Sequence, residues 1–411
     1  MRHESVEPGE SGAEVAAMTN PRRLSRVLIV HNYYKQAGGE DSVVASEKAL
    51  LKKQGHEVSQ YSVDNDNILT FADKARVFFD VVYSESARDA LARELRTVKP
   101  DIVHVHNFFP LLTTSIYDAC QDAGIPVVQT LHNFRITCAG VHLQRQGKLC
   151  EVCVGNNPYW GVLHRCYRGS VLGSLAVARM IDVNQRRGTW RTKVNCFVAL
   201  TEAAKERFVA AGIPADRIVV KPNFAADPGV PATGPRHGAL FVGRLSPEKG
   251  VRELIAAWHG VDYPLRIAGS GPLASELRAN APPQVTFLGQ VSAEDVQREM
   301  AAAAMLVTFS NCLEGFPVVL AEAFAAGLPA VVSDLGAPKD IVRHGETGLH
   351  VPVGNALALA RTVNDLRRDP SAMERMGKAA RQDYLANYTP EANYRHLVAI
   401  YNRVLRPEMA I

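Results

Sequence analysis

The sequence has little of what would place a chain in a membrane, outside the cell or on nucleic acid. None of its apolar runs approaches the roughly 20 residues that cross a bilayer, and its polar start lacks the apolar middle of a secretory signal. The 46 Lys and Arg residues barely exceed the 42 Asp and Glu residues, too even a balance for a dedicated nucleic-acid-binding protein. We therefore expect a cytoplasmic protein that binds no nucleic acid.

Cysteine is also scarce, and the 7 cysteines of the chain exclude a disulfide scaffold in a reducing compartment. Four of them follow the pattern Cys-x11-Cys-x2-Cys-x12-Cys, in which a close pair is flanked by two single cysteines. Such a set can bind zinc tetrahedrally, and a metal would explain how the loop-like segment between the cysteines becomes ordered. The alternative is that they are small buried hydrophobic residues. The spacing favours a closed structural zinc site at Cys138, Cys150, Cys153 and Cys166.

Short apolar runs that alternate with helical patterns fill most of the chain. After a polar segment over 1–24, which we expect to be disordered, strand–helix units begin at Arg26 and begin again near residue 215. Near-continuous apolar strands separated by helices are typical of parallel sheets covered on both faces. We predict an α/β chain of two Rossmann-like, doubly wound domains, 25–214 and 215–388, that face a cleft.

The stretch Ser310–Glu322, SNCLEGFPVVLAE, leaves a predicted strand and opens a helix near Pro317. The free N–H groups and positive dipole of a helix start suit a phosphate. Glu314 precedes that start and Glu322 lies inside the helix, so one carboxylate can bind a hydroxyl at the mouth while the other reaches a sugar beside the phosphates. The alternative is that Glu314 is a capping or loop acid and Glu322 a solvated helix residue.

Two cations follow the first strand of the same domain, in the sequence GRLSPEKG. Arg244 and Lys249 lie in a strand-to-helix loop at the same sheet edge, where they could hold a diphosphate. Alone, they are as well explained as surface charges beside Glu248. The next loops, Gly269–Gly271 and Gly289–Val291, carry short side chains that would let a ligand approach the backbone.

Taken in order, GRLSPEKG, AGSGP, FLGQV and EGFPVVLAE resemble the donor half of the family 4 retaining glycosyltransferases, which have the GT-B fold. The resemblance implies that Arg244 and Lys249 bind the leaving diphosphate, that Glu314 contacts the donor sugar and that Glu322 contacts the ribose. It also implies that the last helix crosses back, so that 389–411 completes the first domain. Further donor contacts are implied at Gly271, Val291, Gly315, Phe316 and Pro317.

In the first domain the resemblance extends to Gly38-Gly39, a loop that approaches the donor phosphates and the acceptor, and to His132, which lies near the donor sugar. A tight turn before a helix explains the glycines equally well. His104 and His106 are interpreted as packed residues. The cysteine insertion after His132 resembles that of a subset of these transferases and suggests an acceptor-side element.

The resemblance implies a retaining transferase that moves a sugar from a nucleotide diphosphate sugar to a hydroxyl of a glycan or lipid-linked acceptor, without a catalytic cofactor. The alternatives are a nucleotide-sugar epimerase of the same fold and a non-catalytic nucleotide-sugar-binding protein. The segment 165–193 holds seven cations against Asp182 alone. It is either a solvated arginine-rich face or a peripheral contact with anionic lipid on the inner face of the membrane.

Overall fold

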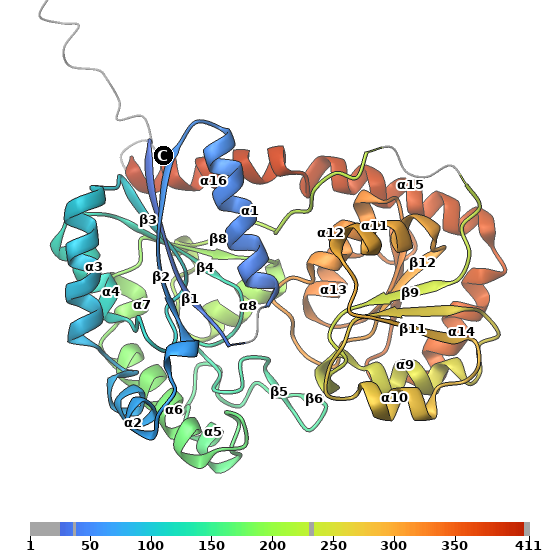
Figure 1. Ribbon diagram of the computed structural model, residues 1–411, viewed down its shortest axis with the longest axis horizontal. Helices are drawn as coiled ribbons and strands as arrows, with labels where there is room; N and C mark the ends of the chain where they lie inside the picture. The colour runs from blue at the N-terminus through green and yellow to red at the C-terminus, as the bar shows by residue number, and fades with distance from the viewer. Residues whose placement is uncertain (1–24, 36–37, 230–233, 407–411) are drawn as a thin grey trace, which may run out of the picture.

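The computed structural model describes residues 25–35, 38–229 and 234–406. The predicted tail, residues 1–24, lies outside this range. Two α/β domains lie side by side, each built on a parallel sheet (Figure 1). This confirms the predicted fold class.

The first sheet has the strand order β2-β1-β3-β4-β7-β8, and all its pairs are parallel. Its central strands are buried on both faces, which explains why apolar residues such as Val27–Val30 dominate them. The strands are β1 (Arg26–Tyr33), β2 (Glu57–Asp64), β3 (Ile102–Asn107), β4 (Val127–Leu131), β7 (Cys196–Ala199) and β8 (Ile218–Val220). The helices are α1 (Gly39–Lys53), α2 (Phe71–Asp80), α3 (Glu85–Val98), α4 (Ser115–Asp122), α5 (Trp160–Leu163), α6 (Val171–Arg186), α7 (Thr189–Thr192) and α8 (Glu202–Ala210).

The second sheet has the order β11-β10-β9-β12-β13-β14 and is also parallel. Its strands are β9 (Ala239–Val242), β10 (Leu265–Ala268), β11 (Val285–Gly289), β12 (Met305–Thr308), β13 (Ala330–Ser333) and β14 (Gly348–Val351). The helices of this domain are α9 (Val251–Trp258), α10 (Ala274–Asn280), α11 (Ala293–Ala302), α12 (Val318–Ala325), α13 (Gly336–Ile341), α14 (Ala356–Arg367) and α15 (Pro370–Asn387), and α16 (Pro390–Leu405) follows them. Short 3-10 turns occur at Asn65–Asn67, Ala215–Arg217 and Pro247–Lys249.

The first sheet continues past residue 214, where the sequence placed the domain boundary. Strand β8 pairs with β7, so that the first sheet ends at Val220. The boundary was placed too early because β8 is only three residues long and is separated from Pro214 by just one 3-10 turn, Ala215–Arg217. The sequence also left out β14 and the small antiparallel hairpin of β5 (Gln144–Arg145) and β6 (Lys148–Leu149).

The last helix joins the two domains. After α15 packs on the second domain, α16 runs along the upper edge of the first (Figure 1). Its Leu397, Ile400 and Tyr401 lie in one buried cluster with residues of β1, β3, β4 and β7. The chain therefore returns to the first domain at its end.

Candidate functional site

Two adjoining cavities lie at the carboxyl edge of the second sheet. One, of about 900 Å³, is lined by the loops after β9, β10 and β11 and includes Arg244, Gly271 and Val291. The other, of about 1060 Å³, reaches from Gly39 of the first domain to Glu322 of the second. They share Val291 and other residues of the same edge, so together they form one cleft between the domains, where ligands of doubly wound sheets bind.

Lys249 and Glu314 form an ion pair beside this cleft, next to Glu248 of the first cavity's wall, although neither of the two lines either cavity. The ammonium of Lys249 donates a hydrogen bond of 2.5 Å to Glu314, and the hydroxyl of Ser310 donates to the other carboxylate oxygen. Burial alone would raise the pKa of Glu314, but Lys249 and Ser310 hold it below its usual value. Burial likewise opposes the charge of Lys249, whose pKa Glu314 raises. Both groups are therefore charged, and the cation is fixed in place for a ligand.

Arg244 is held less tightly. Its guanidinium donates a 2.8 Å hydrogen bond to Glu248, which also accepts from the hydroxyl of Ser246. The side chain of Arg244 is 51% exposed yet lines the first cavity. Arg244 is therefore a half-exposed cation that pairs with Glu248, as the alternative interpretation had it, and that also lines the cavity.

The helix α12 begins where the sequence predicted, with Pro317 at its N-cap. Glu322 lines the larger cavity, and burial raises its pKa. The ring of Phe316 packs 5.9 Å from that of Tyr388 in the core, so only the backbone of Phe316 can serve a ligand.

The glycines of this edge are required by loop packing. A Cβ on Gly271 would lie 2.5 Å from the carbonyl oxygen of Leu245, and one on Gly269 would lie 1.9 Å from that of Gly243. A Cβ on Gly315 would lie 2.1 Å from the carbonyl oxygen of His132, across the domain interface. Gly315 and His132, which the sequence predicted as donor contacts from different domains, are therefore neighbours.

Gly38 and Gly39 begin helix α1. Gly38 is its N-cap and donates its N–H to Asp41, while Gly39 lines the larger cavity. A Cβ on either glycine would meet no atom of the described residues within 4 Å. Space is thus left open at this helix start, on the side of the cleft.

Several polar residues near His132 were missed by the sequence analysis. Glu40 accepts weak hydrogen bonds from the side-chain amides of Asn107, at 3.4 Å, and Asn133, at 3.3 Å. Asp41 bonds Nε2 of His31 at 2.8 Å. Only their positions in the sequence could have indicated them, because Glu40 and Asp41 directly follow the Gly-Gly loop and Asn107 ends a strand. Together they add an acidic and amide-rich wall to the first-domain side.

Glu40→Gln is expected to stabilise the protein in alkaline solution. Burial, reinforced by Asp41, raises the pKa of Glu40 to about 8, above an unfolded value near 4.5. The folded state therefore keeps a proton that the unfolded state loses, and stability falls as the pH rises from about 4.5 to 8. The variant has no such proton to lose. As the pH rises from 4.5 to 9, its free energy of unfolding should therefore increase by roughly 1–3 kcal/mol relative to that of the wild type.

Urea unfolding across this pH range measures the gain. Glu85→Gln, in the exposed first turn of α3, is the matched control and should run parallel to the wild type. A Glu40→Gln curve that also stays parallel would show that Glu40 is ionised throughout.

The cysteine insertion reaches the donor side of the cleft. The carbonyl of His142, between the first two cysteines, accepts a 3.2 Å hydrogen bond from the N–H of Leu313 in the second domain. Burial lowers the pKa of the His142 imidazole, against the opposing effect of Glu248 and Glu314. The insertion therefore touches the loop that carries Glu314, a contact that its interpretation as an acceptor-side element did not include.

The four cysteines of the insertion are free thiols near one another. Burial and the other three thiols raise the pKa of Cys153 to about 11. In the described part of the chain, the groups of ligand atoms that lie within 4.8 Å of one another contain no cysteine. The remaining three cysteines, at Cys120, Cys196 and Cys312, are buried, in line with a packing role.

The basic segment 165–193, expected to be either a solvated arginine-rich face or a lipid contact, is not exposed along its whole length. The apolar residues of α6 pack into the core of the first domain, Val177, Met180 and Ile181 among them. Arg186 pairs with Asp182 and Lys193 with Asp118. The segment packs against the first domain because the apolar face of α6 forms part of that domain's core. None of the described helices is both long and apolar enough to cross a bilayer.

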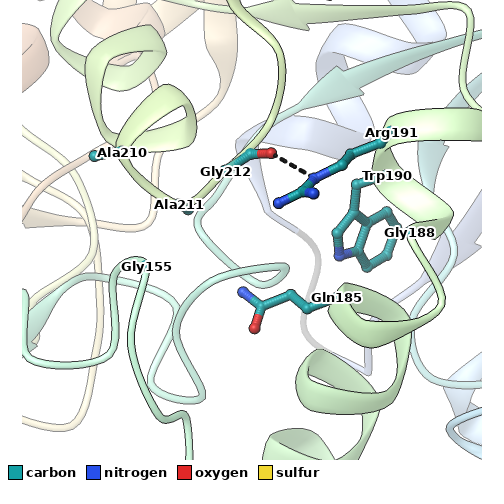
Figure 2. Close-up of a pocket in the computed structure, with 8 residues that line it drawn as sticks. All are labelled: Gly155, Gln185, Gly188, Trp190, Arg191, Ala210, Ala211 and Gly212. Carbon is teal, nitrogen blue, oxygen red and sulfur yellow. Dashed lines mark hydrogen bonds between the residues drawn. The ribbon is translucent and has the colours of Figure 1, made fainter.

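A smaller pocket, of about 210 Å³, lies elsewhere in the first domain (Figure 2). It is bounded by the ends of α6 and α8, by the side chains of Gln185, Trp190 and Arg191, and by Gly155 of the insertion. Arg191 donates a hydrogen bond to the carbonyl of Gly212 across it. It shares no residue with the cleft.

Both halves of the chain match known family models. Residues 37–225 match "Glycosyltransferase Family 4", and residues 231–383 match "Glycosyl transferases group 1". Each half of the chain therefore belongs to a glycosyltransferase family. The D-rhamnosyltransferase WbpZ of Pseudomonas aeruginosa is 36% identical to this glycosyltransferase, over 38% of this chain and 42% of that one. The phosphatidyl-myo-inositol mannosyltransferase of Mycobacterium leprae is 31% identical, over 67% of this chain and 66% of that one.

The fold is that of the GT-B glycosyltransferases. The structure of Anabaena Alr3699/HepE in complex with UDP superimposes with a TM-score of 0.65 and 17% identity, over 91% of this chain and 99% of that one. The glycosyltransferase described here spans from 25% to 66% of the length of the first curated relatives that it matches.

Proposed function

We propose that this chain transfers a sugar from a nucleotide diphosphate sugar to a hydroxyl of a glycan or lipid-linked acceptor, with retention, in cell-surface polysaccharide synthesis. The observation that carries the proposal is that Arg244 and Glu322 line the two cavities of the cleft, while Lys249 and Glu314 pair in the neighbouring loops that follow β9 and β12. Anabaena HepE, of the same fold, has been crystallised with UDP and with UDP-glucose, which supports a nucleotide sugar as donor.

In the proposed reaction the bond between the sugar C1 and the diphosphate oxygen breaks, and the diphosphate leaves with the electron pair. The acceptor oxygen bonds C1 from the same face, and its proton passes to the leaving phosphate. Arg244, Lys249 and the N–H groups at the start of α12 stabilise the charge on the diphosphate in a site closed to water. No protein base is required, and His132 positions the sugar.

A thermal-shift screen of nucleotides and nucleotide sugars tests the proposal first. A donor at a hundred times its dissociation constant stabilises the protein by about 2.7 kcal/mol. The stabilising nucleotide sugar is then incubated with the protein alone. Conversion of the sugar to its epimer would favour the epimerase, whereas slow hydrolysis with an unchanged anomeric configuration is the result expected of a retaining transferase.

We further propose that Cys138, Cys150, Cys153 and Cys166 bind a structural zinc ion. The donor set fits, because four sulfurs complete a tetrahedral site and leave no position for catalysis. Burial raises the pKa of Cys138, but the N–H groups of nearby residues donate to its sulfur and favour the thiolate. The sulfurs must draw together on binding, since Zn–S bonds of about 2.3 Å bring them within about 3.8 Å of one another.

Purified protein is expected to contain one equivalent of zinc, which Cys153→Ser should lose with a fall of several degrees in the unfolding midpoint. Cys120→Ala, which removes a buried thiol of α4, is the control and should keep the metal. Elemental analysis well below one equivalent in the wild type would refute the zinc site.

We also propose a peripheral contact with anionic lipid, confined to one tip of the first domain. Helices α2 and α5 contact α6 there (Figure 1). Large apolar side chains are exposed on these helices: Phe71, Phe79, Leu163 and Leu172. Arg165 and Arg168, which are also exposed, lie between Leu163 and Leu172 in the sequence. Such a surface suits the interface of a bilayer. Sedimentation with phosphatidylglycerol vesicles but not with phosphatidylcholine vesicles is expected, and loss of binding in Phe71→Ser/Phe79→Ser. Equal binding to both vesicles would contradict the contact.

A further inference from the structure

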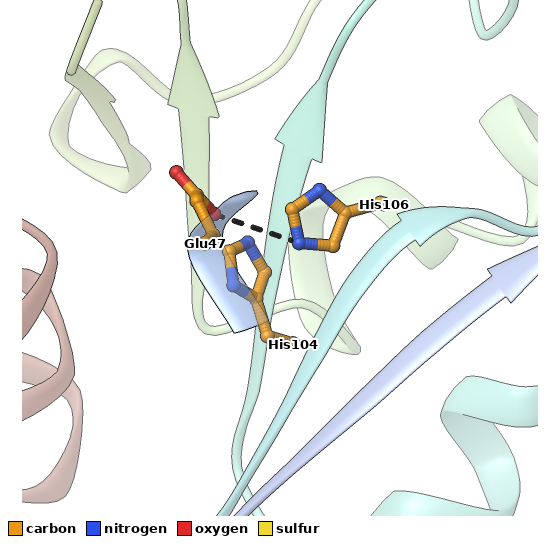
Figure 3. A group of neighbouring side chains, drawn as sticks. All are labelled: Glu47, His104 and His106. Carbon is orange, nitrogen blue, oxygen red and sulfur yellow. Dashed lines mark ion pairs between the residues drawn. The ribbon is translucent and has the colours of Figure 1, made fainter. Parts of the chain in front are cut away.

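A chain of buried polar side chains runs through the first domain to His132 at the domain interface. Lys221, which follows β8, donates a 2.6 Å hydrogen bond to one carboxylate oxygen of Glu47 in α1. The other oxygen of Glu47 lies 3.6 Å from Nε2 of His106 in β3 (Figure 3). Nδ1 of His106 in turn lies 3.0 Å from Nε2 of His132. The side chains of Lys221, Glu47 and His106 are at most 1% exposed.

The contact between Glu47 and His106 decides which nitrogen of His106 carries the proton. Both Oε2 of Glu47 and Nε2 of His106 are buried without a hydrogen-bond partner in the described part of the chain, and they face each other at 3.6 Å. Burial alone would raise the pKa of Glu47, but Lys221 holds it below its usual value, so the carboxylate is an anion. Because an anion repels a lone pair in a medium of low polarity, the N–H of His106 is favoured at Nε2, toward Glu47.

The proton of His106 then determines that of His132. With its N–H at Nε2, His106 can only accept at Nδ1, so Nε2 of His132 must be the donor of their hydrogen bond. Burial lowers the pKa of His132 to about 3 and that of His106 well below its usual value, so both rings are neutral and each has one N–H. Nδ1 of His132 keeps a lone pair and has no partner among the described residues.

We propose that Lys221, Glu47 and His106 are positioning residues that hold His132 as its Nε2–H tautomer, so that Nδ1 offers a hydrogen-bond acceptor to a hydroxyl of the donor sugar. We place this hydroxyl on the donor sugar because the backbone of His132 packs against Gly315, in the loop of the second domain that also carries Glu314. The identity of the hydroxyl rests on the proposed function, whereas the tautomer does not.

A metal ion explains the cluster less well. Ligand atoms of Glu47, His104 and His106 do lie within 4.8 Å of one another. However, the two ring nitrogens of His104 already share hydrogen bonds with Tyr401, at 2.7 Å, and Thr130, at 2.8 Å. The ammonium of Lys221 also offsets the only anion of the group. A cation would find neither a free lone pair on His104 nor an unpaired charge.

Long-range ¹H–¹⁵N spectra of the intact, ¹⁵N-histidine-labelled protein read the tautomers directly. His106→Gln and His132→Asn assign the two rings. In the wild type at neutral pH, we expect both rings to carry the proton at Nε2. A proton at Nδ1 of either ring, or a mixture of tautomers, would overturn the proposal, and no ligand is needed for this result.

A paired substitution tests whether the anion selects the tautomer. Glu47→Gln/Lys221→Met removes both charges together and should leave His106 and His132 as tautomer mixtures, while Glu374→Gln/Lys378→Met, an exposed pair, should not. Pure Nε2–H rings in the first variant would overturn the proposal. With a stabilising nucleotide sugar, the same variant should bind the sugar donor about 2–10-fold more weakly and the nucleoside diphosphate equally well, the range expected for one hydrogen bond. Equal weakening of both would refute the sugar contact. If the variant fails to fold, the wild-type spectrum still decides.

Discussion

Lys249→Met is expected to reduce sugar transfer by about 10²- to 10³-fold, the usual cost of removing one group that stabilises a transition-state charge. Of the two cations that we propose to bind the diphosphate, Lys249 is held more firmly, because its ammonium donates a 2.5 Å hydrogen bond to Glu314. The loss should fall mainly on kcat, because the charge on the diphosphate grows as the bond to the sugar breaks. Turnover of the donor found by thermal shift measures it.

Two controls separate chemistry from folding in this experiment. Lys378→Met, on exposed α15, should leave transfer unchanged. Lys249→Met/Glu314→Gln removes the partner carboxylate as well and should unfold at a temperature near that of the wild type while remaining inactive. Wild-type turnover in Lys249→Met would show that the diphosphate is held elsewhere.

Lys221→Met is expected to destabilise the first domain by about 3–5 kcal/mol, because it leaves the Glu47 carboxylate buried without a cation. Both side chains are essentially inaccessible, at 0% and 1% exposure, so water cannot replace the ammonium. The free energy of unfolding in urea measures this effect.

Glu47→Gln/Lys221→Met should recover most of that loss, since no uncompensated charge remains. The exposed pair of Lys378 and Glu374 provides the matched comparison, and Lys378→Met should cost less than about 1 kcal/mol. A similar small cost for Lys221→Met would mean that Glu47 takes up a proton instead of remaining an anion.

The sequence predicted the fold well because parallel strands buried on both faces leave an unambiguous apolar pattern. Val27 to Val30 in β1 and Ala330 to Val332 in β13 are examples. It failed where strands are short and partly exposed. The three residues of β8 are too few to be distinguished from a linker. In β14, Leu349 and His350 are both partly exposed, so the strand lacks a buried apolar run.

The sequence could predict the part of the candidate site that lies in one continuous segment, such as the loop with Glu314 and the helix with Glu322. What could not be read was how residues from distant segments meet. The contact of Gly315 with His132, and that of Leu313 with His142, depend on the packing of two domains. His106 was interpreted as a packed residue, and it is buried, but its bond to His132 appears only in three dimensions.

The most direct test of the account is a crystal structure with the nucleoside diphosphate of the donor that most stabilises the protein. We predict a diphosphate within hydrogen-bond distance of Arg244, Lys249 and the first N–H groups of α12, with Glu322 at the ribose. A nucleotide bound outside this edge of the second sheet, or a diphosphate that contacts neither cation, would contradict the proposed donor site.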